Sequence, residues 1–155
     1  FNFEQLAKAS LVKVDLNGSA TPWMDSKMYN EISFSPDGNY VMVSAIKKPF
    51  SYIVPYYRFP FETVIYDKTG KEISKVNDVA LSEVLPIWFM AEREGRRDLN
   101  WRSDAPATLV YAKVLDGGDP EVEVAYRDEV FLLDAPFKGD RGSILQTMDS
   151  FSGIS

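Results

Sequence analysis

The 155-residue sequence contains no cysteine and no histidine. Without cysteine the chain has neither a disulfide nor a thiolate metal site. Without histidine it lacks the most frequent general base and a common metal ligand. It also lacks a Gly-x-Ser-x-Gly element, so these residues cannot supply a Ser-His-Asp triad. No apolar run approaches the roughly 20 residues of a membrane-spanning helix. We therefore expect no catalytic residue, no metal, no cofactor and no membrane contact in this chain.

Charge and composition narrow the class of protein further. Acidic residues outnumber basic ones, 23 to 17, which gives a formal net charge of −6 and argues against nucleic acid as a partner. Hydrophobic residues make up 45% of the chain and aromatic residues 14%, as in a folded protein. The length fits one domain spanning residues 1–155, and the abundance of Tyr, Phe, Val and Ile favours strands.

The clearest local pattern is a hairpin between Glu31 and Ile46. Ile32 and Phe34 alternate with serines, which is typical of a half-buried strand. Ser35-Pro36-Asp37-Gly38 predicts a tight turn, because Pro presets φ and Gly accepts positive φ. The nearly continuous apolar run from Tyr40 onward predicts a strand that is covered on both faces.

The hairpin pattern recurs further along the chain. Trp101 follows Phe34 by 67 residues, and Asp134 follows Asp67 by the same interval, each in a similar setting. Two landmarks at one spacing indicate an internal repeat, although any all-β chain can show similar hairpins by chance.

The other expected elements follow from alternation and turn residues. Residues 1–9 form an amphipathic lead-in with a helical turn, and Asn17-Gly18 is a primed-type turn. The expected strands span residues 11–16, 29–35, 39–46, 61–67, 71–76, 98–102, 108–114, 129–133 and 143–148. The expected connections are residues 21–27, 47–60, 77–97 with a helical turn at 79–84, and 115–128. Residues 152–155 resemble the start of a third cycle, that is, a third copy of the repeated strand pattern.

Four antiparallel strands per repeat, with apolar inner strands, are typical of a β-propeller blade. The expected fold is therefore all-β: a partial β-propeller of about two four-stranded antiparallel blades plus flanking strands. A closed sandwich or barrel explains the strands and turns equally well. The chain begins at Phe1 without a charged and then apolar leader, so we expect a processed or excised piece of a larger protein. Exposed blade edges predict self-association, or a lead-in that folds over one face.

Up-and-down topology places the long connections at one end of the strands, where function usually lies on a rigid β scaffold. That end is expected to carry Tyr56, Tyr57 and Arg58 from one loop and Arg96 and Arg97 from the next. The alternative is that the tyrosines pack their loop down and the arginines are solvated or paired with nearby acids.

Several longer segments resemble a known family. They are Ser35–Ser44, Pro49–Pro55, Arg58–Pro60, Leu99–Asp104, Asp116–Asp119, Val122–Val124 and Gly153–Ser155. They are similar to the propeller of the glutamyl endopeptidase branch of the prolyl oligopeptidase family. The likeness covers nearly the whole chain.

The resemblance implies a serine peptidase as the parent protein, with a C-terminal α/β-hydrolase domain of the same polypeptide as the partner of this chain. This chain would be the non-catalytic propeller portion that gates and helps select peptide substrates. A stand-alone propeller-like binding or scaffold module is the alternative. A bacterial parent would be periplasmic or secreted, and this chain shows no signal segment.

Cleavage after glutamate, which the resemblance implies, requires a cation for the substrate carboxylate, and arginine binds carboxylates bidentately. We expect Arg58 to be the best candidate, because Pro55 and Pro60 stiffen its loop, with Arg96 and Arg97 next and Tyr56 and Tyr57 as supports. The alternative is that the pocket for the substrate glutamate lies wholly in the hydrolase domain.

Overall fold

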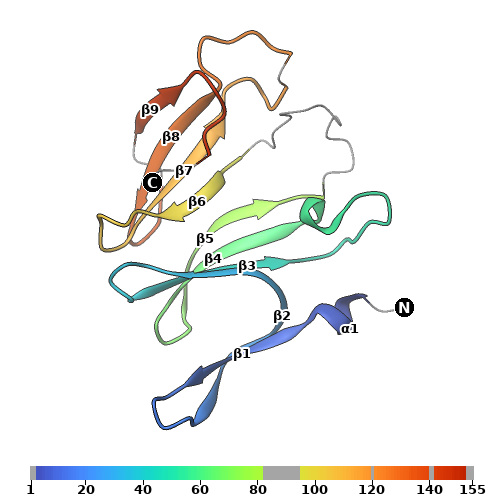
Figure 1. The fold of residues 1–155 in the computed structure, drawn as a ribbon, viewed down its shortest axis with the longest axis vertical. Helices are drawn as coiled ribbons and strands as arrows, with labels where there is room; N and C mark the ends of the chain where they lie inside the picture. Colours follow the sequence, from blue (N-terminus) through green and yellow to red (C-terminus); the bar gives the residue numbers. More distant parts are fainter. Residues whose placement is uncertain (1–2, 82–94, 120, 140–141, 153–155) are drawn as a thin grey trace. The chain divides into compact units, whose positions relative to one another are not determined.

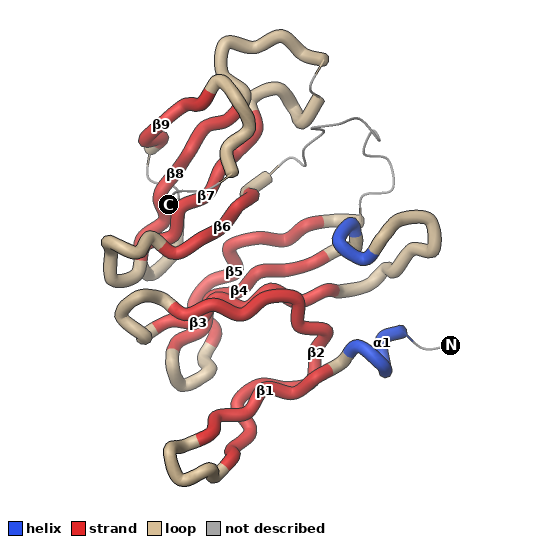
Figure 2. Tube along the Cα trace, in the orientation of Figure 1, coloured by secondary structure: helices blue, strands red, loops and turns tan. Residues whose placement is uncertain are grey.

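The computed structural model describes residues 3–81, 95–119, 121–139 and 142–152. Its strands are β1 (Ala9–Val14), β2 (Ala20–Phe34), β3 (Tyr40–Ile46), β4 (Phe61–Asp67), β5 (Glu72–Val79), β6 (Arg97–Trp101), β7 (Thr108–Val114), β8 (Asp128–Asp134) and β9 (Ser143–Thr147). The helical elements are the short helix α1 (Phe3–Ala7) and the 3₁₀ turn η1 (Tyr56–Arg58). The expectation of an all-β chain is confirmed, as is the helical turn in the lead-in (Figures 1 and 2).

The strands form two antiparallel sheets with neighbours in chain order, β1-β2-β3-β4-β5 and β6-β7-β8-β9. The chain divides into two compact units that follow these sheets. Unit 1 is Phe1–Phe34 with Asn39–Leu81, and unit 2 is Ser35–Gly38 with Ser82–Ser155.

Two four-stranded meanders, β2 to β5 and β6 to β9, have the same strand order, and their inner strands match in length and spacing. β4 and β8 have the same length and start 67 residues apart, at Phe61 and Asp128. β3 and β7 also match in length and start 68 residues apart, at Tyr40 and Thr108. The matching strand order and spacing support the internal repeat.

The inner strands form the core of each unit, because both faces of these strands are covered. In β3 the five residues between Tyr40 and Ile46 are all buried. In β7 the first five residues are buried, and Tyr111 is fully inaccessible. The outer strands β1 and β9 are largely exposed instead.

The predicted connection over residues 21–27 is wrong, because these residues are the first half of β2. This half pairs with β1, from Lys27 opposite Ala9 to Ala20 opposite Val14, whereas the second half pairs with β3. Residues 20–27 are mostly exposed, and their sequence lacks the alternation of a half-buried strand.

The predicted primed turn at Asn17-Gly18 is also wrong. Gly18 has a φ of 86°, but Asn17 is not among the described residues with positive φ, and a type I′ turn needs positive φ at both. The Asp15 carbonyl accepts a hydrogen bond from the Gly18 amide at 3.0 Å, and the Asp15 amide donates to the Ser19 carbonyl at 3.0 Å. This is a three-residue loop with glycine in the left-handed position.

The remaining boundaries agree with the sequence expectations to within a few residues. β5 continues to Val79, so the start of the predicted helical turn at 79–84 is strand; residues 82–84 lie outside the described part of the chain. The third cycle predicted at 152–155 falls almost entirely outside it.

Register fixes which loops share an end in each sheet. In unit 1 the loop from Lys47 to Pro60 joins β3 to β4, and Phe61 at its far side lies opposite both Ile46 and Val79. The short turns lie at the other end of these strands. We call the end with the 47–60 loop the long-loop end of unit 1.

Candidate functional site

The 47–60 loop is closed at its base and exposed at its tip. The Lys47 amide donates to the Pro60 carbonyl at 2.8 Å, and both Phe59 and Pro60 are buried. The Phe59 ring lies 5.7 Å from Phe50. Tyr52 at the tip is fully exposed. A loop with a fixed base and an exposed aromatic tip can present side chains to a ligand.

The 3₁₀ turn η1 sets the positions of Tyr56, Tyr57 and Arg58. The Arg58 amide donates to the Pro55 carbonyl at 2.9 Å, and the Phe59 amide donates to the Tyr56 carbonyl at 3.0 Å. The two tyrosines are more than half exposed, and their rings meet edge to face at 6.0 Å. They therefore do not pack the loop down.

Arg58 is half-buried, and its guanidinium makes no ion pair or hydrogen bond with any residue in the described ranges. Its planar group is thus available to a carboxylate.

A lysine cluster, which the sequence analysis did not identify, surrounds the same end of unit 1. Five lysines (Lys8, Lys27, Lys47, Lys48 and Lys75) share three carboxylates (Glu4, Glu62 and Asp78). Glu4 bridges Lys8 at 2.8 Å and Lys48 at 2.6 Å, and hydrogen bonds from these lysines lower the pKa of Glu4 to about 2. The sequence predicts Lys47 and Lys48 at this end, but Lys27 and Lys75 join them only through strand pairing.

Arg96 in unit 2 lies against aromatic rings. Its guanidinium carbon is 4.9 Å from the centroid of Tyr111, and Tyr111 stacks on Phe131 at 5.4 Å. The Lys113 ammonium lies 4.8 Å from the Phe131 centroid. A cation over an aromatic face gains about 0.5–2 kcal/mol depending on its exposure, so this placement holds Arg96 at the sheet.

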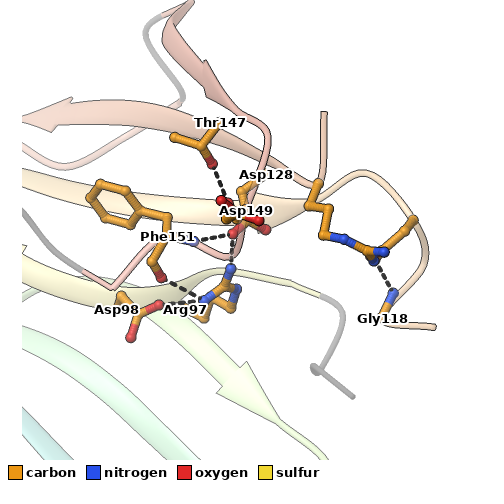
Figure 3. A network of polar contacts seen from close by, with 9 residues as sticks. Arg97, Asp98, Gly118, Asp128, Thr147, Asp149 and Phe151 are labelled. Atoms are coloured by element: carbon orange, nitrogen blue, oxygen red, sulfur yellow. Dashed lines mark hydrogen bonds and ion pairs between the residues drawn. The ribbon is translucent and has the colours of Figure 1, made fainter. Parts of the chain in front are cut away.

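Arg97 is the centre of a polar network at the start of β6 (Figure 3). One of its terminal nitrogens bonds Asp128, and the other bonds Asp98 at 2.6 Å and the Phe151 carbonyl at 2.9 Å. The Phe151 amide donates to the same Asp128 oxygen. Burial raises the pKa of Asp98, against the lowering effect of Arg97. The network ties β6, β8 and the segment after β9 together.

The third predicted long loop, residues 115–128, is one residue shorter in the structure because β8 begins at Asp128, and an ion pair and a backbone hydrogen bond close it. Arg127 pairs with Asp116 at 2.8 Å, and the Leu115 amide donates to the Arg127 carbonyl at 2.7 Å. The side chain of Asp119 accepts the Glu121 amide at 2.9 Å.

The structure therefore places the five predicted residues in two groups. Tyr56, Tyr57 and Arg58 are neighbours in unit 1, whereas Arg96 and Arg97 belong to unit 2. The described ranges hold no group of three or more metal-ligating side chains. No helix within them is long and apolar enough to cross a membrane.

Sequence comparison with curated proteins gives two matches over 99% of the chain. One is a rice protein (Oryza sativa subsp. japonica), 38% identical over 155 residues, and the other is from Arabidopsis thaliana, 35% identical over 155 residues. Both are named probable glutamyl endopeptidase, chloroplastic. The chain spans only 16% of the length of either protein. No family model and no solved structure matches the chain.

The chain is thus an all-β protein with two equivalent antiparallel meanders. It is related, over nearly its whole length, to a segment of proteins named glutamyl endopeptidase, which confirms the resemblance to glutamyl endopeptidases.

Proposed function

We propose that this chain is a non-catalytic portion of a glutamyl endopeptidase-like serine peptidase of the prolyl oligopeptidase family. In this proposal residues 1–155 form a single partial β-propeller domain that gates and helps select peptide substrates. The observation that carries the proposal is the extent of the match, 99% of this chain against 16% of each relative. Catalytic residues would come from a C-terminal α/β-hydrolase domain of the same polypeptide, since this chain has no histidine for a triad.

The meanders support the propeller assignment. A blade is a four-stranded antiparallel sheet, and propellers repeat it about four to eight times. β2 to β5 and β6 to β9 have the strand order and the near-constant spacing that such a repeat requires.

The selecting role rests on Arg58. It sits on a 3₁₀ turn beside two exposed tyrosines, and its guanidinium has no protein partner within the described residues. Arg96 and Arg97 are secondary in this proposal, because Tyr111 and Asp128 already engage them. A charged hydrogen bond to a substrate carboxylate contributes about 1.5–3 kcal/mol.

The test is Arg58→Ala in the full-length polypeptide. We expect kcat/KM for glutamyl substrates to fall about ten- to a hundredfold, from the loss of that hydrogen bond, with weak cleavage after neutral residues nearly unchanged. Arg102→Ala is the matched control, because it removes a guanidinium from a short turn at which Arg102 pairs with Asp104. Equal losses on both substrate types, or no loss, would remove Arg58 from substrate selection. The isolated chain serves as the blank and is expected to hydrolyse nothing.

A stand-alone binding or scaffold module is the second candidate. The position of the chain in its polypeptide separates the two, because continuation into a domain with a Gly-x-Ser-x-Gly nucleophile elbow is expected only for the peptidase.

A further inference from the structure

Two hollows adjoin at the long-loop end of unit 1. The first, of about 340 Å³, is lined by charged side chains that include Lys8, Lys27, Lys47 and Glu62. The second, of about 400 Å³, is lined mainly by aromatic rings: Phe3, Tyr52, Tyr56 and Phe59. Glu4, Lys48 and Phe50 line both hollows. A cationic hollow and an apolar hollow therefore share one wall.

The charged side has an excess of positive charge. Among the described residues, two groups of ion pairs there join five lysines to three carboxylates, a surplus of two positive charges in a chain whose net charge is −6. Asp78 forms ion pairs with Lys47 and, at 3.4 Å, with Lys75. Glu62 forms ion pairs with Lys75 at 3.0 Å and with Lys27 at 3.7 Å. The cluster thus attracts an anion in spite of the acidic protein around it.

Two adjacent residues of the chain show what fits this surface. The Phe3 ring meets Phe50 at 5.5 Å and Phe59 at 5.9 Å, edge to face in both cases. The next residue, Glu4, places its carboxylate between Lys8 and Lys48. Helix α1 has five residues, none of them buried, and a helix this short is marginal by itself. The Phe3 ring contacts and the Glu4–Lys48 ion pair therefore tie α1 to the 47–60 loop.

We propose that this surface is a binding site for a peptide segment with a carboxylate side chain directly beside a large apolar side chain, and that Phe3 and Glu4 occupy part of it. The lysine ammonium groups bind the carboxylate of the peptide as point charges. The apolar side chain next to that carboxylate packs against the rings of the aromatic hollow. The site rests on the proposed function and extends it, because it adds a second binding position for acidic peptides in unit 1. Its test uses neither Arg58 nor peptide cleavage, so the two proposals can fail separately.

The test measures binding of acetyl-Phe-Glu-amide to the 155-residue chain by NMR chemical-shift titration. Acetyl-Phe-Gln-amide and acetyl-Ala-Glu-amide are the matched controls, and each is expected to bind about tenfold more weakly, because each lacks one of the two groups. Inorganic phosphate is expected not to compete at equal concentration. Equal binding of the glutamine peptide, or full displacement by phosphate, would overturn the proposal.

Variants locate the site. Lys48→Gln is expected to weaken peptide binding about tenfold. Lys71 is an exposed lysine beside the β4–β5 turn, and Lys71→Gln is expected to leave binding unchanged.

The double variant Phe3→Ala with Glu4→Gln is expected to raise affinity about tenfold, because it removes the internal occupant. The amide spectrum of each variant reports whether the sheet is intact. Unchanged or lower affinity of the folded double variant would contradict occupation by Phe3 and Glu4. Equal losses of peptide affinity in Lys48→Gln and Lys71→Gln would show that net charge alone determines binding, and would overturn the proposed site.

Discussion

Arg97 and Asp128 form an ion pair that is almost completely removed from water, with 13% and 1% of their side-chain surface exposed. Asp128 also accepts the Phe151 amide, so one carboxylate oxygen accepts from a guanidinium nitrogen and from a backbone amide. The sequence predicts Arg97 at the strand ends that carry the long connections, but it does not show this pairing, because the two residues meet only when β6, β7 and β8 align.

We predict that Asp128→Ala destabilises unit 2 strongly. Removal of one member of a buried ion pair leaves a desolvated charge and costs about 3–5 kcal/mol. The opening free energy of the β7 and β8 amides, measured by native-state hydrogen exchange, is the readout. Asp104→Ala is the matched control, because the Arg102–Asp104 pair is exposed and such pairs contribute about 0–1 kcal/mol. Similar losses in both variants would show that Arg97 does not depend on Asp128.

At the scale of the elements, buried strands were predictable and exposed ones were not. β3 and β7 are continuous apolar runs, and their bounds match the expected strands to within one residue. The first half of β2 was missed because it lies in an exposed ribbon with Pro22, where neither alternation nor a continuous run appears. At the candidate site, the exposed loop with Arg58 was predictable from its prolines, whereas the lysine cluster depends on pairing between β2, β3, β4 and β5.

The β4–β5 turn offers a test of local packing. Gly70 has a φ of 93°, and a Cβ there would lie 3.0 Å from Nε1 of Trp23. Gly18, in the matching turn of the β1–β2 hairpin, has a φ of 86° and open space around it. The two glycines share a strained backbone conformation and differ in the Trp23 contact.

We predict a graded loss of stability in three variants, measured as the free energy of unfolding in urea. Gly18→Ala should cost about 1–2 kcal/mol, the usual penalty for an L residue in the left-handed region. Gly70→Ala should cost more, because Trp23 must also move. Gly142→Ala is the control: its φ is not in that region and its surroundings are open, so we expect a change within about 0.5 kcal/mol. Equal losses for Gly18→Ala and Gly70→Ala would mean that the Trp23 contact does not constrain the turn.

At the scale of the whole molecule, the outer strands expose apolar side chains. Val12 and Val14 on β1 are 51% and 63% exposed, and Ile144 and Leu145 on β9 are 51% and 50% exposed. Both strands end their sheets, and each hydrogen-bonds to a single neighbour among the strands that the structure describes. An exposed apolar edge strand is a template for pairing with another chain, and proteins usually protect such edges with charge or cover.

We therefore predict that the isolated 155-residue chain self-associates in a concentration-dependent way, measured as mass by light scattering. The variant Ile144→Lys with Leu145→Lys should shift the chain toward monomer, because lysine on an edge strand opposes pairing with a second edge. The control is Tyr52→Lys with Ile53→Lys, which adds the same charge at the exposed tip of the 47–60 loop and not on a strand edge. If both pairs of lysines reduce the mass equally, net charge rather than edge pairing drives the association. A wild-type chain that stays monomeric at high concentration would show that α1 or another segment already protects these edges.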